Sequence, residues 1–133
     1  MNFQEDINFI TKQWIKKAEA DLLTVKHELS FFDEEIIVET VCFHSQQAIE
    51  KYLKAFLVFK QKEFSKTHDL EELRKLCKEI DKSFSNLEFK NLTDFAVVCR
   101  YPDDFLNPTL EEAKEAYDLA LSAKEFIISK INL

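Results

Sequence analysis

Histidine, glutamine and lysine side chains recur along one predicted helix at spacings that would bring them together. His44, Gln47, Lys51 and Lys54 fall within about 80° of one another at 100° per residue, beside the apolar face of that helix. Imidazole, amide and ammonium groups on one ridge are suited to hold a phosphate or a nucleotide. The alternative is a solvated helix face whose lysines pair with Glu50 or other carboxylates. The spacing predicts a shared polar ridge and leaves both roles open.

A second polar group, formed by Thr67, His68 and Asp69, precedes the apolar residues of the next predicted helix. A helix start offers free backbone amides and the positive end of the helix dipole, and both favour anions. Asp69, with Glu72 three positions later, also has the form of an N-cap with its capping partner. The group is predicted either to bind an anion or to cap the helix and leave its imidazole exposed.

A third polar group consists of Arg100, Tyr101 and Asp103, which lie around Pro102. An arginine at this place can complement the C-terminal end of a helix before a Tyr-Pro stop signal. It can equally reach a groove of the bundle and hold a phosphate through its two-pronged guanidinium group. Arg74 is the only other arginine of the chain.

Several kinds of catalytic centre are excluded or disfavoured by what the chain lacks. It contains no glycine, which excludes phosphate-binding loops, dinucleotide-binding fingerprints and nucleophile elbows. A di-iron bundle needs Glu-x-x-His pairs, but Thr24, Val41 and Ser65 stand three positions before the histidines. No cysteine and histidine spacing matches a zinc site. We therefore expect neither a metal nor a cofactor.

The cysteines and the apolar runs point to a cytoplasmic location. Cys42, Cys77 and Cys99 are widely spaced and odd in number, which is typical of reduced, mostly buried thiols. The first residues have neither the basic start nor the apolar core of a signal peptide. The apolar runs are too short for a bilayer span, so no membrane association is expected.

The charge balance bears on the partners of the protein. There are 25 acidic and 18 basic residues, which gives a formal net charge of −7. This sign disfavours direct binding of nucleic acid, because such binding draws its affinity from releasing counterions of the phosphate backbone. A local basic patch remains compatible with this balance.

The elements that position these groups are predicted to be helices throughout. Apolar residues recur at steps of three and four, and no stretch shows sustained period-two alternation. Asn86 is predicted to cap the fourth helix, and Thr109 with Glu112 forms a capping box for the fifth. The predicted fold is all-α, a single domain over residues 1–133 with about five helices in an antiparallel up-and-down bundle. The helices are expected near 7–29, 34–61, 70–80, 86–99 and 110–131.

Three polar residues are predicted to lie in or beside the apolar core. Ser45 and Gln46 point into the apolar arc of the second predicted helix, so Gln46 should hydrogen-bond backbone or another side chain. Asp21 lies beside the apolar stripe of the first helix. A structural ion pair or a cap is the expected role of its carboxylate.

Four segments in a fixed order carry a resemblance to a known family. The chain resembles the HEPN domain of prokaryotes over nearly its whole length, through residues 18–22, 42–55, 66–70 and 100–103. The resemblance implies a helical bundle that is commonly dimeric. Many members are encoded beside a minimal nucleotidyltransferase and are thought to bind nucleotide or substrate for it, whereas others are RNases of toxin–antitoxin systems.

The resemblance does not extend to the RNase motif of the family, in which an arginine precedes a histidine by four to six positions. His27, His44 and His68 all come before Arg74 and Arg100, so no arginine precedes a histidine here. We therefore expect a non-catalytic subunit that binds a nucleotide or substrate and is the partner of a minimal nucleotidyltransferase. The two proteins could form a toxin–antitoxin pair. The alternative is a metal-independent HEPN-type RNase with a degenerate site.

Overall fold

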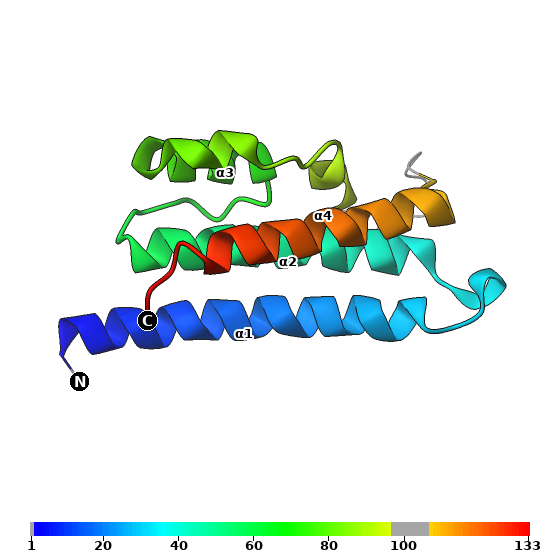
Figure 1. Cartoon of the computed structure of the whole chain (residues 1–133), viewed down its shortest axis with the longest axis horizontal. Coiled ribbons are helices and arrows are strands. Elements are labelled where there is room, and N and C mark those ends of the chain that lie inside the picture. The colour runs from blue at the N-terminus through cyan, green and yellow to red at the C-terminus, as the bar shows by residue number, and fades with distance from the viewer. Residues whose placement is uncertain (1, 97–106) are drawn as a thin grey trace.

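The computed structural model of the protein describes residues 2–96 and 107–133 and, over those residues, is built from helices without strands. This confirms the predicted all-α bundle, which Figure 1 shows. The α-helices are α1 (Phe3–Leu29), α2 (Val38–Phe59), α3 (Leu70–Ile80) and α4 (Leu110–Ile128). Short 3-10 helices connect them: η1 (Asp33–Glu35), η2 (Lys82–Asn86) and η3 (Leu92–Ala96).

The central element is α2, which contacts α1, α3 and α4. Figure 1 shows α1 running antiparallel to α2, while α4 runs in the same direction as α2. The ring of Phe84 lies 4.5 Å from the ring of Phe56 on α2 and 5.0 Å from that of Phe126 on α4, measured between centroids. This aromatic contact holds the C-terminal ends of both helices together.

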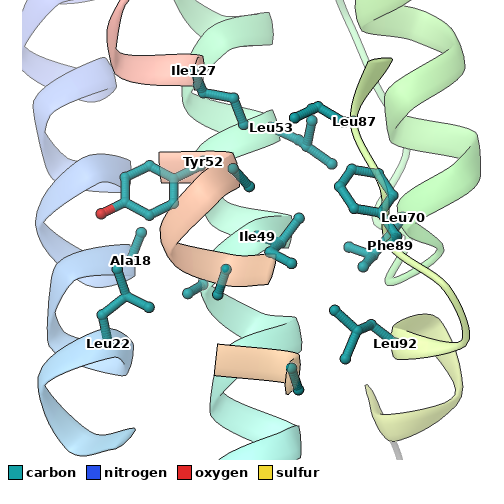
Figure 2. Close-up of a cluster of buried hydrophobic side chains, with 14 of the residues drawn as sticks. Ala18, Leu22, Ile49, Tyr52, Leu53, Leu70, Leu87, Phe89, Leu92 and Ile127 are labelled. Carbon is teal, nitrogen blue, oxygen red and sulfur yellow. The ribbon is translucent and has the colours of Figure 1, made fainter. Parts of the chain in front are cut away.

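Small side chains let α4 approach α2 closely. The buried residues of α4 are spaced three and four apart, and all but the last are alanines: Ala113, Ala116, Ala120, Ala123 and Ile127. The distance between two packed helices depends on the side chains at their contact, so an alanine stripe permits a short one. Larger apolar residues of α2 fill the core that Figure 2 shows, among them Ile49, Tyr52 and Leu53.

Side-chain caps fix the starts of three α-helices. The capping box predicted at Thr109 and Glu112 is confirmed, and Asp69 caps α3 as predicted. α1 begins at Phe3, earlier than the predicted start, because Asn2 and Glu5 form a further capping box. An Asn-x-x-Glu pair satisfies the first free amides of a helix in the same way as Thr-x-x-Glu does.

The C-terminal end of α2 closes without a glycine. Gln61 adopts a left-handed conformation with φ of 58°, and its N–H donates to the carbonyl of Val58. The N–H of Lys62 donates to the carbonyl of Leu57 at 2.8 Å. This pair of bonds is the Schellman motif, which usually places glycine at the left-handed position. It turns the chain into residues 60–69, the connector that leads to α3.

The fourth predicted helix is wrong over the residues that the structure describes. Asn86 does not cap a helix but ends η2, and Lys90 interrupts the segment with φ of 49°. Leu92 and Phe95 are buried three positions apart, which matches the three residues per turn of a 3-10 helix. Residues 97–106, where the predicted helix would have ended, lie outside the described residues and include Cys99.

Cys42 and Cys77 are reduced, buried thiols, as predicted. Burial raises the pKa of the Cys77 thiol to about 12, because a thiolate is poorly solvated in an apolar surrounding. Burial, and secondarily the nearby charge of Glu19, raises the pKa of the Tyr52 hydroxyl. Within the described residues, no helix is both long and apolar enough to cross a bilayer.

Candidate functional site

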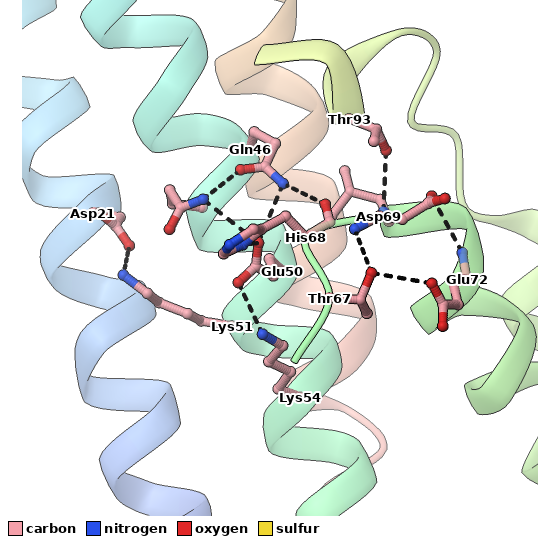
Figure 3. Close-up of polar contacts among 12 residues, drawn as sticks. Asp21, Gln46, Glu50, Lys51, Lys54, Thr67, His68, Asp69, Glu72 and Thr93 are labelled. Atoms are coloured by element: carbon pink, nitrogen blue, oxygen red, sulfur yellow. Dashed lines mark hydrogen bonds and ion pairs between the residues drawn. The ribbon is translucent and has the colours of Figure 1, made fainter. Parts of the chain in front are cut away.

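Polar side chains from α1, α2 and the connector meet at one edge of α2, as Figure 3 shows for most of them. We call them the polar cluster, and each contacts at least one other member through a hydrogen bond or an ion pair. Its members are Asp21, His44, Gln46, Gln47, Glu50, Lys51, Lys54 and His68. The cluster contains two carboxylates, and each binds one histidine and one lysine.

Asp21 joins α1 to α2. Its Oδ1 lies 2.7 Å from Nδ1 of His44, and its Oδ2 accepts a hydrogen bond from Nζ of Lys51 at 2.6 Å. The Asp21 side chain is 9% exposed, whereas His44 and Lys51 keep 29% and 22% of their side-chain surface accessible. The structural ion pair predicted for Asp21 is confirmed by its contact with Lys51, and both His44 and Lys51 remain within reach of a ligand.

Glu50 joins α2 to the connector. Its Oε1 lies 2.9 Å from Nδ1 of His68, and its Oε2 accepts from Nζ of Lys54 at 3.0 Å. Glu50 and Lys54 are 4% and 7% exposed, but the His68 side chain is 53% exposed. A buried carboxylate therefore holds an imidazole whose outer part faces solvent.

Gln46 and Gln47 complete the hydrogen bonding around Glu50. The Gln46 amide donates to the backbone carbonyl of His68 at 3.0 Å and accepts from the Gln47 amide at 2.6 Å. Gln46 is fully buried, and its bond to a backbone carbonyl confirms the interpretation that its amide needs a partner in the core. Through this bond, the connector is held against α2 at the position of His68.

The Lys54 side chain is more buried than a residue on a solvated ridge would be. Its ammonium nitrogen is 5.5 Å from the ring centroid of Trp14 on α1 and 5.8 Å from that of Phe64 on the connector. The two rings contact each other edge to face at 6.5 Å. Cation–π contacts of this kind help to stabilise a desolvated ammonium group. Lys54 therefore positions Glu50, and its own ammonium is closed off from a ligand.

Thr67 and Asp69 serve the start of α3. Oδ1 of Asp69 accepts from the backbone N–H of Glu71 at 2.9 Å, and Oγ1 of Thr67 donates to a carboxylate oxygen of Glu72 at 3.0 Å. The N–H of Leu70 donates to Oγ1 of Thr93 at 3.0 Å. These amides are thus occupied by side chains, which supports the capping role at this helix start. Glu72 binds Thr67 instead of closing a capping box with Asp69.

The predicted site residues are therefore only partly brought together. His44, Gln47, Lys51, Lys54 and His68 lie in the polar cluster. Thr67 and Asp69 lie beside it and hold α3. The remaining three predicted residues, Arg100, Tyr101 and Asp103, lie outside the described residues.

The sequence did not single out Trp14 or Phe64. Nothing in their spacing distinguishes them from core aromatic residues, because the lysine that they cover lies on another element. An ion pair or a cap was predicted for Asp21, and Glu50 was named only as a partner of lysines in the alternative role of the ridge. The role of both carboxylates in orienting imidazoles depends on contacts across elements.

The geometry assigns a hydrogen-bonding role to one ring nitrogen of each histidine. An ionised carboxylate accepts hydrogen bonds only, so Nδ1 of His44 and of His68 must donate to Asp21 and Glu50. The other ring nitrogen, Nε2, is left to accept when the ring is neutral and to donate when it is protonated. The ionised carboxylates balance Lys51 and Lys54, so positive charge in excess arises only from the histidines.

Metal binding finds no support in this arrangement. Over residues 2–96 and 107–133, no group of three or more histidine, cysteine, aspartate or glutamate side chains is placed to hold a metal ion. Each imidazole of the polar cluster has a single carboxylate neighbour and a lysine next to that carboxylate. The arrangement is suited to hydrogen bonding with an anionic or polar ligand.

Comparison with protein families identifies one domain. The family model of the HEPN domain matches residues 11–130, which include the polar cluster and all four α-helices apart from the first turns of α1. Comparisons with curated proteins and with solved structures found no match. The chain thus belongs to the HEPN domain family.

Proposed function

We propose that this HEPN protein is a non-catalytic, nucleotide-binding subunit that works beside a minimal nucleotidyltransferase in the cytoplasm. The observation that carries the proposal is the polar cluster, in which buried carboxylates hold His44, Lys51 and His68 at an accessible edge of α2. Membership of the HEPN family supports the same role.

Phosphate oxygens are the ligand atoms that these side chains suit best. Lys51 donates to Asp21 through one of its three ammonium hydrogens and is 22% exposed, so it can donate to a phosphate as well. Protonated His44 and His68 each add a donor at Nε2. Because both imidazoles are already oriented by carboxylates, little ordering entropy is lost when a ligand binds.

The absence of the ordered Arg-to-His motif from the sequence supports the non-catalytic part of the proposal. In the RNases of the family, the imidazole of that motif acts on the RNA backbone, and general acid–base catalysis contributes about 10²–10⁴-fold to a rate. All three histidines of this chain come before both arginines. The protein is therefore proposed to bind its ligand without cleaving RNA.

A calorimetric titration with ATP and with GTP, without and with magnesium, tests the proposal. We expect binding that weakens by about tenfold or more in Lys51→Ala, because a charged hydrogen bond is worth about 1.5–3 kcal/mol. Arg100→Ala is expected to weaken binding too. Lys114→Ala is the matched control, since Lys114 is an exposed lysine of α4 outside the polar cluster.

Two results would contradict parts of the proposal. No heat and no thermal shift at millimolar nucleotide would contradict nucleotide binding by the isolated protein. The proposed subunit is also a homodimer or part of a hetero-complex, as the family resemblance implies. A hydrodynamic mass of a monomer at micromolar concentration would contradict the homodimer.

A further inference from the structure

An apolar hollow continues the polar cluster along α1. It has a volume of about 310 Å³ and is lined by Ile10, Gln13, Trp14 and Lys17. At 100° per residue, Ile10, Trp14 and Lys17 each lie within about 40° of Asp21 around α1. Lys17 precedes Asp21 by about one helical turn. The hollow and the polar cluster therefore occupy one face of the helix.

Trp14 is the wall that the hollow shares with the polar cluster. Lys54 lies over its ring at 5.5 Å, and Phe64 contacts it edge to face. The indole also lines the hollow and is only half-buried. These contacts hold the ring in place from the side of the cluster, so a ligand in the hollow meets a preorganised aromatic surface.

The lining of the hollow combines an aromatic ring and an apolar side chain with polar groups, which suits a flat aromatic ligand with a polar edge. Ile10 is 47% exposed and supplies an apolar wall beside the indole. The exposed amide of Gln13 offers both donors and an acceptor, the pattern that pairs with N6 and N7 of adenine. Lys17 adds an exposed ammonium group between the hollow and Asp21.

We infer that this hollow is the base subsite of the nucleotide site: an adenine ring stacks on Trp14, its edge bonds Gln13, and its phosphates extend past Lys17 to Lys51. The inference rests on the proposed function, which places the phosphates at the polar cluster. Stacking on an aromatic side chain needs only the π-face of the base, and the amide of Gln13 supplies the preference for adenine.

Trp14 is the only tryptophan of the chain, so its fluorescence reports on the hollow directly. The protein is titrated with ATP, adenosine and inorganic tripolyphosphate while the emission of Trp14 and the heat of binding are recorded. ATP and adenosine should quench the emission saturably, whereas tripolyphosphate should bind without quenching it. Adenosine tests the hollow alone, and tripolyphosphate tests the polar cluster alone.

Variants separate the aromatic surface from the fold. Trp14→Leu should weaken ATP about tenfold, because stacking of one base is worth about 1–3 kcal/mol. It should weaken tripolyphosphate much less than ATP, although Trp14 also contacts Lys54 of the polar cluster. Trp14→Phe keeps an aromatic face and should retain most of the affinity for ATP. Gln13→Ala changes an exposed side chain and should weaken adenosine and ATP but not tripolyphosphate.

The outcomes distinguish the two proposals. Heat of ATP binding without a change in Trp14 emission, and with equal affinity in Trp14→Leu and Gln13→Ala, would overturn the base subsite and leave the proposed function intact. If adenosine quenches the emission but ATP binds no more tightly than adenosine, the hollow would be supported as a base site and phosphate binding at the polar cluster would be contradicted. Absence of binding by both ATP and adenosine would overturn both proposals.

Discussion

Glu50 is the residue on which the polar cluster depends most. It is 4% exposed, and its two oxygens contact Lys54 and His68 at 3.0 and 2.9 Å. Lys54 is 7% exposed and is covered by Trp14 and Phe64. A buried ion pair contributes less than its Coulomb energy suggests, but removing one partner leaves an uncompensated buried charge.

We expect Glu50→Ala to lower the free energy of unfolding by about 3–5 kcal/mol, because the ammonium of Lys54 loses its counter-ion. Urea denaturation measures this change. The control is Glu79→Ala, which breaks the exposed pair of Lys62 and Glu79, whose side chains are 41% and 50% exposed. That change should cost less than about 1 kcal/mol. Equal losses in the two variants would contradict the account of Glu50.

Cys77 is predicted to be unreactive in the folded protein. Its thiol lies 3.8 Å from the carbonyl of Leu53, and burial raises its pKa to about 12. The raised pKa disfavours the thiolate of Cys77, and both Cys77 and Cys42 are buried, so a disulfide reagent at pH 8 should not modify either thiol until the chain unfolds. The measurement uses Cys99→Ser, with the same variant in urea as control. Rapid modification of the folded variant would contradict the burial of these thiols.

The same raised pKa has a consequence at alkaline pH. A group whose pKa is higher in the folded state contributes stability that is lost as the pH rises from its ordinary value toward the raised one. For Cys77 this range runs from 9.0 to about 12. Cys77→Ala should therefore show a weaker decline in stability over that range than the natural chain.

The sequence predicted which polar residues of α2 lie on one ridge, but not how buried each side chain is. His44, Gln47 and Lys51 are half-buried, which suits the predicted ridge. Lys54 was placed on the same ridge but is buried, because its cover comes from Trp14 and Phe64. A helical projection gives the side of one helix on which a residue lies. It does not give what another element places over that residue.

The turn at the C-terminal end of α2 contains one of the two described residues with a left-handed conformation, Gln61; the other is Lys90. Gln61 holds a left-handed conformation that costs a residue with a side chain about 1–2 kcal/mol. Glycine adopts this conformation freely, but the chain has none. The connector that carries His68 starts at this turn. The strained conformation of Gln61 therefore directs the chain towards the position where His68 joins the polar cluster.

Gln61→Gly is expected to raise the free energy of unfolding by about 0.5–1 kcal/mol. The relief of left-handed strain exceeds the entropy that glycine adds to the unfolded chain. Thermal or urea denaturation measures the change, with Gln61→Ala as the control that keeps the strain. A loss of stability in Gln61→Gly would contradict the assigned strain.

Asp81 connects the end of α3 with η2 and the C-terminal residues. Its pKa is lowered to about 2, first by hydrogen bonds from the hydroxyl and N–H of Ser83 and then by Lys130. A lowered pKa means that the carboxylate stabilises the fold above its ordinary pKa of about 4 and loses this effect as the pH falls toward 2.

Asp81→Asn should therefore destabilise the protein at pH 7 and pH 5, and the difference from the natural chain should shrink at pH 3. Urea denaturation at the three values measures it. Ser83→Ala removes the hydroxyl that has the largest effect on the pKa and serves as the companion variant. A difference that does not change with pH would contradict the role of the ionised carboxylate.

Helix starts with a clear capping pattern in the sequence were predicted correctly. The capping box at Thr109 and the cap at Asp69 were predicted because their donors and acceptors lie within a few residues. The helix expected after Asn86 was wrong over the described residues. The spacing of Leu92 and Phe95 fits both helix types, and only burial against α2 and α3 selects the 3-10 form.

The net charge of the whole chain differs from the local charge of the polar cluster. The chain carries −7, yet the cluster balances its ionised carboxylates with lysines and becomes positive when its histidines are protonated. Weak attraction for nucleic acid stays a prediction from the net charge, whereas the charge balance within the polar cluster follows only from contacts between elements. The all-α fold was predictable from periodicity, because most of the buried core residues lie on helices.

The most direct test of nucleotide binding at the polar cluster is to follow the three histidine side chains by NMR during a titration with ATP. His44 and His68 lie in the cluster, whereas His27 is an exposed residue in the last turn of α1 and serves as an internal control. The imidazole signals of His44 and His68 should shift saturably with one affinity, while those of His27 stay in place. Unchanged signals of His44 and His68 at millimolar ATP, or equal shifts of all three, would contradict nucleotide binding at the polar cluster.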